Sequence, residues 1–188
     1  EDYGFPTEIL SESALEAALA PERIETLRED LARGGVGQIQ YLAPWFDQRL
    51  VRKAEVDWIF SQAVLEHVDD LDTTYGAFAE WLKPDGAMTH QIDFKCHNMA
   101  PEWNGHWACS PRMWRLVRGR RPYLLNRQPV STHLDLLQKN RFEVVADHRI
   151  IQDDGFSKDQ LLDRYADLDD ETLKTSGSFI VAQRAVGV

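Results

Sequence analysis

The stretch Val56-Asp57-Trp58-Ile59-Phe60-Ser61-Gln62-Ala63-Val64-Leu65-Glu66-His67-Val68 decides the expected fold of this chain. It opens as a short apolar run with aromatic and β-branched residues, which predicts a buried strand. The run breaks at Ser61-Gln62, and residues 63–68 have the composition of a short helical turn. A strand that ends in a turn bearing Ser, Gln, Glu and His is typical of an open α/β sheet, where ligands bind just beyond the carboxyl ends of the strands.

The composition is that of an ordinary soluble domain and excludes several classes of partner. The 188 residues are 43% hydrophobic and 28% charged, enough for one domain with a full core. A formal net charge of −10 argues against a nucleic-acid partner, because phosphate binding needs a basic surface. Cys96 and Cys109 are too few for a disulfide scaffold, so a reducing, cytoplasmic setting is expected. No apolar run reaches bilayer length, and no membrane partner is expected.

Helical and strand patterns alternate along the chain. Helical patterns cover residues 11–19, 21–33, 69–81 and 132–139, and strand patterns cover residues 38–42, 56–61, 87–92, 142–146 and 178–182. Such alternation predicts parallel strands joined by right-handed crossovers. Gly35-Val36-Gly37 is not read as a dinucleotide loop, because a helix precedes it and a strand follows it.

The spacing of Asp57, Ser61 and the run Leu65-Glu66-His67-Val68 resembles the fourth strand and following loop of Rossmann-like S-adenosylmethionine-dependent methyltransferases of the small-molecule branch. Residues 82–86, Leu-Lys-Pro-Asp-Gly, resemble the Leu-Lys-Pro-Gly-Gly turn of that family, with Asp85 in place of the first glycine. The resemblance spans roughly residues 11–184. It implies a three-layer α/β fold whose mostly parallel sheet has an antiparallel C-terminal edge. It also implies S-adenosylmethionine as cofactor and a small-molecule acceptor, such as a sugar or natural-product hydroxyl or amine.

The resemblance begins after the second strand of the family would have ended. The family has the strand order 3-2-1-4-5-7-6, and its Gly-rich cofactor loop follows the first strand, which nothing in this sequence matches. We therefore expect residues 1–188 to form one partial methyltransferase-like domain, with the strand at 56–61 in mid-sheet beside two strands contributed from outside this sequence. The alternative function is a catalytically silent methyltransferase-like scaffold that acts through a partner. A reductase-like Rossmann domain is disfavoured by the Leu-Glu-His-Val run, and the oligomeric state is left open.

The resemblance also implies where the cofactor binds. The backbone at Ser61 and Gln62 is expected to border it, with Tyr41 and Leu42 at the end of the preceding predicted strand as further contacts. Asp2 is the candidate for the carboxylate that accepts hydrogen bonds from the ribose hydroxyls.

The candidates for acceptor chemistry are Asp93, His97, His67 and His90. Methyl transfer from a sulfonium needs positioning of the two partners and, for a hydroxyl or amine, a base that takes the proton. Strand geometry puts His90 and Ile92 on one face and Asp93 on the other, at the strand exit. We therefore expect His97 and Asp93 at the mouth of the crevice as a base with its orienting carboxylate. The alternative is a polar loop anchor.

No metal is expected in this site. A metal-binding branch of the family places a carboxylate three residues before the Glu-His pair, and Ala63 occupies that position here. Glu66 is predicted to be a solvated first-turn residue that favours the helix dipole. His90, Asp93 and His97 are chemically able to bind a metal, but the sequence does not place them at ligand distances.

Residues 93–127 interrupt the alternation and are expected to form an insertion or lid. The predicted acceptor-binding residues in it are Trp103, Trp107, Arg112 and Arg115. Arginines there suit an anionic acceptor, such as a phosphate-linked sugar, through forked hydrogen bonds. The alternative is a helix whose solvated basic face pairs with acidic neighbours, and the sequence leaves both open.

Overall fold

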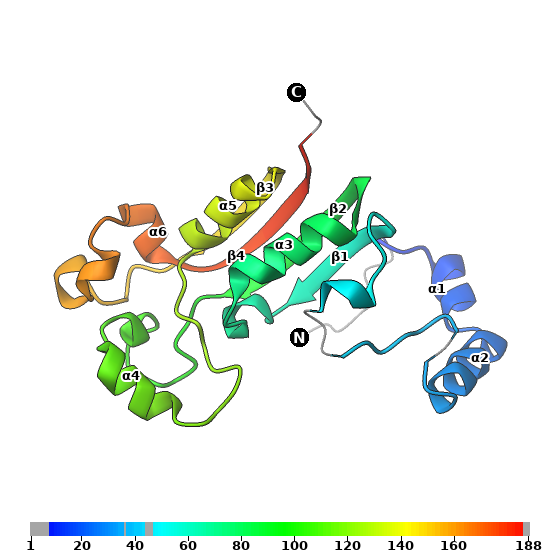
Figure 1. Cartoon of the computed structure of the whole chain (residues 1–188), viewed down its shortest axis with the longest axis horizontal. Coiled ribbons are helices and arrows are strands. Elements are labelled where there is room, and N and C mark those ends of the chain that lie inside the picture. The colour runs from blue at the N-terminus through cyan, green and yellow to red at the C-terminus, as the bar shows by residue number, and fades with distance from the viewer. Residues whose placement is uncertain (1–7, 36, 44–46, 186–188) are drawn as a thin grey trace. The chain divides into compact units, whose positions relative to one another are not determined.

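The computed structural model describes residues 8–35, 37–43 and 47–185, which fall into two compact units, residues 1–45 and 46–188 (Figure 1). The described helices and strands are α1 (Glu12–Ala18), α2 (Pro21–Ala32), η1 (Gln48–Leu50), β1 (Val56–Gln62), η2 (Leu65–His67), α3 (Leu71–Trp81), β2 (Leu82–Asp93), η3 (Gly105–Trp107), α4 (Pro111–Arg118), α5 (Val130–Lys139), β3 (Phe142–Ile151), η4 (Lys158–Gln160), η5 (Asp163–Tyr165), α6 (Asp170–Lys174) and β4 (Thr175–Arg184). Among these, no helix combines the length and apolarity that a membrane span needs.

The first unit contains the two predicted N-terminal helices. The hydroxyl of Ser11 accepts a hydrogen bond from the amide of Ala14 and starts α1, and Pro21 occupies the first turn of α2. Gly34 follows α2 with φ 87°, a left-handed conformation that stops a helix and suits glycine. Both helix boundaries therefore follow the local sequence signals.

The predicted strand at 38–42 is wrong. This segment of the described chain pairs with no strand, and its first amide, that of Gln38, donates instead to the buried Asp30 carboxylate at 2.7 Å. That bond ties the segment back to α2. An extended apolar pattern becomes a strand only where a neighbour completes its hydrogen bonds.

The second unit is built on a four-stranded sheet of order β1-β2-β4-β3. β1 and β2 are parallel, with Ser61 opposite His90, whereas β4 is antiparallel to both β2 and β3. This order matches strands 4-5-7-6 of the expected family order and confirms the antiparallel C-terminal edge. Only one of the three described strand pairs is parallel. β1 is the edge strand of the described sheet, and its expected mid-sheet position, which depends on strands from outside this sequence, stays a prediction.

Helices α3 and α5 cover one face of this sheet, where they lie side by side (Figure 1). The buried positions of the two central strands alternate and face these helices: Met88, His90 and Ile92 on β2, and Ser178, Ile180 and Ala182 on β4. Period-2 alternation of this kind is the pattern of a sheet with one covered face. In the second unit, the described residues supply only one of the two helical layers expected.

The turn predicted at residues 83–86 is a bulge inside a continuous strand. β1 and β2 pair at Val56 with Leu82 and again at Trp58 with Ala87, so β2 carries extra residues between the two pairs. A Cβ on Gly86 would come within 2.8 Å of the Leu82 side chain, which explains the glycine of the Pro-Asp-Gly run.

The covered face contains a buried polar pair whose loss is measurable. The Tyr75 hydroxyl lies 3.0 Å from Nδ1 of His133, and both residues are fully buried. We expect Tyr75→Phe to lower the free energy of unfolding by about 1–3 kcal/mol, because a buried imidazole nitrogen loses its partner. The matched control is Tyr123→Phe, at an exposed tyrosine, with an effect below about 0.5 kcal/mol. Urea unfolding measures the free energy of unfolding of both variants, and equal effects would contradict a stabilising hydrogen bond between Tyr75 and His133.

Candidate active site at the strand ends

The parallel strands β1 and β2 end beside each other, and one set of polar side chains lies just beyond these ends. Past the end of β1, the amide of Ala63 donates to the carbonyl of Gln91 at 2.9 Å, and Ala63 has a left-handed φ of 50°. The chain then turns sharply into η2. Because Ala63 leaves the ladder in this conformation, the residues that follow cross over the end of β2 rather than extending β1.

Asn126, from the far end of the insertion, fixes this turn. Its side-chain amide donates to the carbonyls of Leu65 at 2.7 Å and Val68 at 2.8 Å, and its backbone amide donates to the carbonyl of Glu66 at 2.8 Å. Its side-chain oxygen accepts from the amide of Gln128 at 2.9 Å. Asn126 therefore donates to three carbonyls of this turn, of which only that of Leu65 also accepts from an amide inside the turn, that of Val68 at 3.3 Å.

Glu66 is held inside the protein by this turn. The residue is 3% exposed, and neither carboxylate oxygen has a hydrogen-bond partner among the described residues. Burial raises the pKa of the Glu66 carboxyl to about 7, with a smaller upward contribution from Asp93; the amides of Glu66 and Asp93 lower it. The prediction of a solvated Glu66 is wrong, because the Asn126 contacts turn the residue inward.

Asp93 and His97 lie at the exit of β2, where the sequence placed them. Asp93 Oδ2 is 3.4 Å from His97 Nε2, and each side chain is 39% exposed. Asp93 Oδ1 accepts from the amide of Lys95 at 2.9 Å, which anchors the carboxylate. The imidazole of His67 faces that of His97, with ring centroids 5.4 Å apart, and the Nδ1 of His67 is buried without a partner. Three of the four predicted acceptor-side residues thus gather at one place.

His90 does not belong to this group. It is fully buried under α3, its ring stacks on Phe78 at 5.3 Å, and its Nδ1 is 2.8 Å from the Ser61 hydroxyl. Burial lowers the pKa of His90 to about 4, so the ring is neutral at physiological pH. Its position on the face opposite Asp93 was expected, but that face is the core, and His90 acts as a structural partner of β1.

The predicted cofactor residues fall in different parts of the chain. Gln62 is exposed at the end of β1, and Ser61 beside it is bound to His90 through its side chain. Tyr41 is 86% exposed and Leu42 37% exposed, both in the first unit and outside any strand. Asp2 lies outside the described residues. In the described chain no Gly-rich loop follows a strand, and the cofactor-binding role of these residues stays a prediction.

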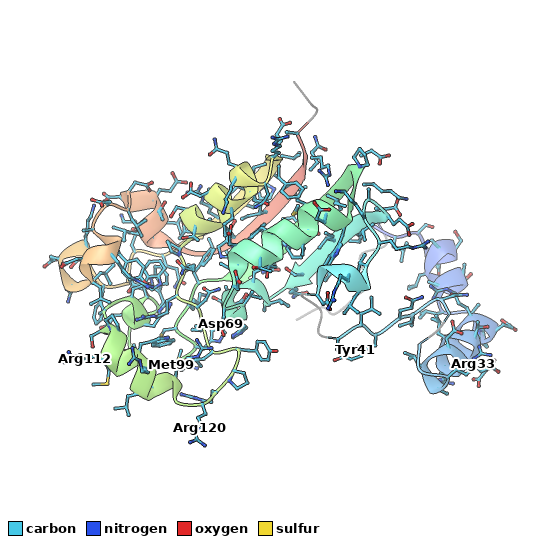
Figure 2. All side chains as sticks on the ribbon, in the orientation of Figure 1. Arg33, Tyr41, Asp69, Met99, Arg112 and Arg120 are labelled. Carbon is cyan, nitrogen blue, oxygen red and sulfur yellow. The ribbon has the colours of Figure 1, made fainter. Side chains whose placement is uncertain are left out.

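Of the predicted acceptor-binding residues in the insertion, the two tryptophans are buried and the two arginines lie on the surface. Trp107 is fully buried and stacks on Tyr165 with ring centroids 5.1 Å apart, so it holds the insertion together. Trp103 borders a separate cavity of about 240 Å³. Arg112 and Arg115 are exposed on α4, and Figure 2 shows the Arg112 side chain pointing away from the body of the unit.

Comparisons with known proteins agree with this geometry. Residues 3–89 match the family model of the methyltransferase domain. An S-adenosylmethionine-dependent methyltransferase from Mesorhizobium loti is 16% identical, with a TM-score of 0.52, over 85% of this chain and 76% of that protein. A structure from Galdieria sulphuraria, described as a sarcosine dimethylglycine methyltransferase, is 13% identical, with a TM-score of 0.51, over 88% of this chain and 67% of that protein. None of the curated proteins matches the sequence.

A third solved structure adds a complex with a second protein. A chain of the complex between the Haloferax volcanii Trm112 methyltransferase activator and a methyltransferase is 15% identical, with a TM-score of 0.50, over 88% of this chain and 69% of that chain. At these identities the likeness shows the fold. The fold defines a Rossmann-like α/β protein of the methyltransferase type. The family model of the methyltransferase domain covers less than half of the chain, so the comparisons show this fold and a likeness to methyltransferase domains over residues 3–89.

The Asn126 contacts generate a prediction about the site. We expect Asn126→Ala to lower the free energy of unfolding by about 2–3 kcal/mol, because the buried carbonyl of Val68 loses its side-chain donor and that of Leu65 keeps only the amide of Val68. It should also speed hydrogen exchange at the amide of His67, which bonds to the carbonyl of Val64 inside the turn. The control is Asn140→Ala at the end of α5, which removes one bond, to the carbonyl of Leu136, and should cost about 1 kcal/mol. Unchanged hydrogen exchange at the amide of His67 in Asn126→Ala would contradict the proposal that Asn126 holds this turn in place.

Proposed function

We propose that this protein transfers a methyl group from S-adenosylmethionine to a hydroxyl or amine of a small molecule bound at the ends of β1 and β2. The observation that carries the proposal is the half-exposed Asp93–His97 pair, one strand away from the end of β1, where the family binds its cofactor. The cofactor supplies a methyl group already activated on a positive sulfur. The chain's own residues then have to orient the acceptor and remove its proton.

In this proposal the Asp93–His97 pair takes the acceptor's proton. The carboxylate of Asp93 is fixed by the amide of Lys95, so it can orient the His97 imidazole and stabilise its positive charge once the proton has arrived. His97 has a left-handed φ of 48°, and its Nε2 lies 3.4 Å from Asp93 Oδ2 at the end of the strand. Arg112 and Arg115 remain candidates for an anionic part of the acceptor, because neither forms an ion pair within the described residues.

A second candidate function is the interaction scaffold, which the exposed face of β1 favours. Trp58 is 60% exposed and Phe60 57% exposed, with ring centroids 5.8 Å apart, on a strand whose outer edge has no partner in the described sheet. Large exposed aromatics on an open edge are typical of an interface. The structure from Haloferax volcanii, which contains an activator protein, supports the same idea.

Calorimetry of the intact protein with S-adenosylhomocysteine separates the two. The enzyme proposal predicts one binding site with a dissociation constant below about 100 µM. Asp93→Asn should leave this affinity within about twofold and lower the rate of S-adenosylhomocysteine formation by about 100-fold with the hydroxyl and amine acceptors of a test panel. The control is Asp57→Asn, at a carboxylate on β1 that pairs with Lys83.

The outcomes are distinct. No heat of binding at millimolar S-adenosylhomocysteine would sink the enzyme proposal and leave the scaffold. Loss of affinity and turnover together in Asp93→Asn would instead make Asp93 a residue that supports the fold.

A further inference from the structure

Beside the Asp93–His97 pair lie two further polar side chains, those of Glu66 and His67, which have no part in the proposed reaction. One oxygen of Glu66 and one ring nitrogen each of His67 and His97 all lie within 4.8 Å of one another. The three come from two segments far apart in the sequence, the turn after β1 and the loop after β2. We propose that Glu66, His67 and His97 form a binding site for a divalent transition metal, with zinc or manganese as the ions that fit best.

The chemistry of the three donors supports a metal of this kind. Two imidazoles and one carboxylate are ligands that zinc and the neighbouring first-row metals share. A tetrahedral zinc with bonds of about 2.1 Å holds its ligand atoms about 3.4 Å apart, so atoms up to 4.8 Å apart must move closer by at most about 1.4 Å. The side chain of His97 is 39% exposed and can make that movement by rotating about its own bonds.

The buried carboxylate of Glu66 is an independent reason. Both of its oxygens are buried without a hydrogen-bond partner, and so is Nδ1 of His67. An unpaired carboxylate inside a protein is costly, and a bound cation removes that cost. The rival explanation is a protonated Glu66 beside a water in the cavity of about 10 Å³ that Glu66, Asp93 and Arg127 line.

This site differs from the pattern on which the sequence argument relied. Ala63 stands where a carboxylate would complete the motif in the metal-binding branch, so the local sequence alone argued against a metal. The structure supplies the third donor from the loop after β2 instead, through His97. The second-sphere partner is Asp93, 3.4 Å from the His97 ring, which can orient that ring toward a metal as readily as toward a substrate.

A metal here has a consequence for the reaction, and this step rests on the proposed function. With His97 bound to the ion, an acceptor hydroxyl that coordinates the ion has a lowered pKa. His97 would then be a ligand and no longer the base, so the proton would pass to the Asp93 carboxylate instead. The resulting oxygen anion would form the bond to the methyl carbon as the sulfur–carbon bond breaks. The acceptor class would accordingly be a hydroxyl compound rather than an amine.

The test is calorimetry of the intact protein, freed of metal with EDTA and then titrated with ZnCl₂ or MnCl₂ alone. We expect one site per chain with a dissociation constant of about 10 µM or tighter for at least one of the two ions. Glu66→Gln and His97→Ala should each weaken this binding by at least tenfold. The control is His148→Ala, at an exposed histidine on β3 that stacks on Phe179, which should bind as the wild type does.

Two further readouts keep the proposal falsifiable. Metal-free Glu66→Gln should melt at or above the wild-type temperature at pH 8, because it removes a buried charge, and the metal should raise the melting temperature of the wild type only. The metal site would be overturned if the wild type bound both ions no tighter than millimolar, or if Glu66→Gln and His97→Ala bound them as tightly as the wild type. Either result would favour a protonated Glu66. S-adenosylhomocysteine affinity, measured in EDTA, is independent of this result, so failure of the metal site and failure of the proposed function are told apart.

Discussion

The candidate site depends on one side chain that lies outside it. Asn126 donates to the carbonyls on either side of Glu66 and His67, and its own backbone amide bonds to the carbonyl between them. Without these bonds a five-residue turn with a left-handed residue at its start would have many accessible conformations, most of them with the polar side chains in water. With them, the Glu66 carboxylate points into the protein and the His67 ring points at the loop after β2.

This constraint connects the insertion with the sheet. The segment that ends at Asn126 is itself held by the buried Arg127, whose guanidinium donates to the carbonyls of His106 and Cys109 and lies over the Trp114 ring. The insertion therefore has a small core of its own, to which Trp107 and Tyr165 also belong. The interior of the insertion stabilises the insertion itself, whereas α4 stays exposed. The insertion contributes to the crevice through Asn126 rather than through its tryptophans.

The sequence was a good guide where a pattern is local. The apolar run at residues 56–61, the strand pattern at 142–146, the helix signals before Tyr75 and the strand exit at Asp93 were all readable, because each is a local pattern or a cap within a few residues. The pattern at 38–42 misled because a strand needs a partner, and Asp30 satisfies its first amide instead. Glu66 and His90 misled for a related reason: their burial is decided by Asn126 and Phe78, which no local pattern connects to them.

The central claim is that the ends of β1 and β2, and not another surface, receive the cofactor. The most direct test is the two-dimensional ¹⁵N NMR spectrum of the intact protein as S-adenosylhomocysteine is added. The account predicts that the amides of Ser61, Gln62 and Ala63 shift most strongly. Shifts confined to the cavity beside Trp103 and Gly155, with the end of β1 unchanged, would contradict it.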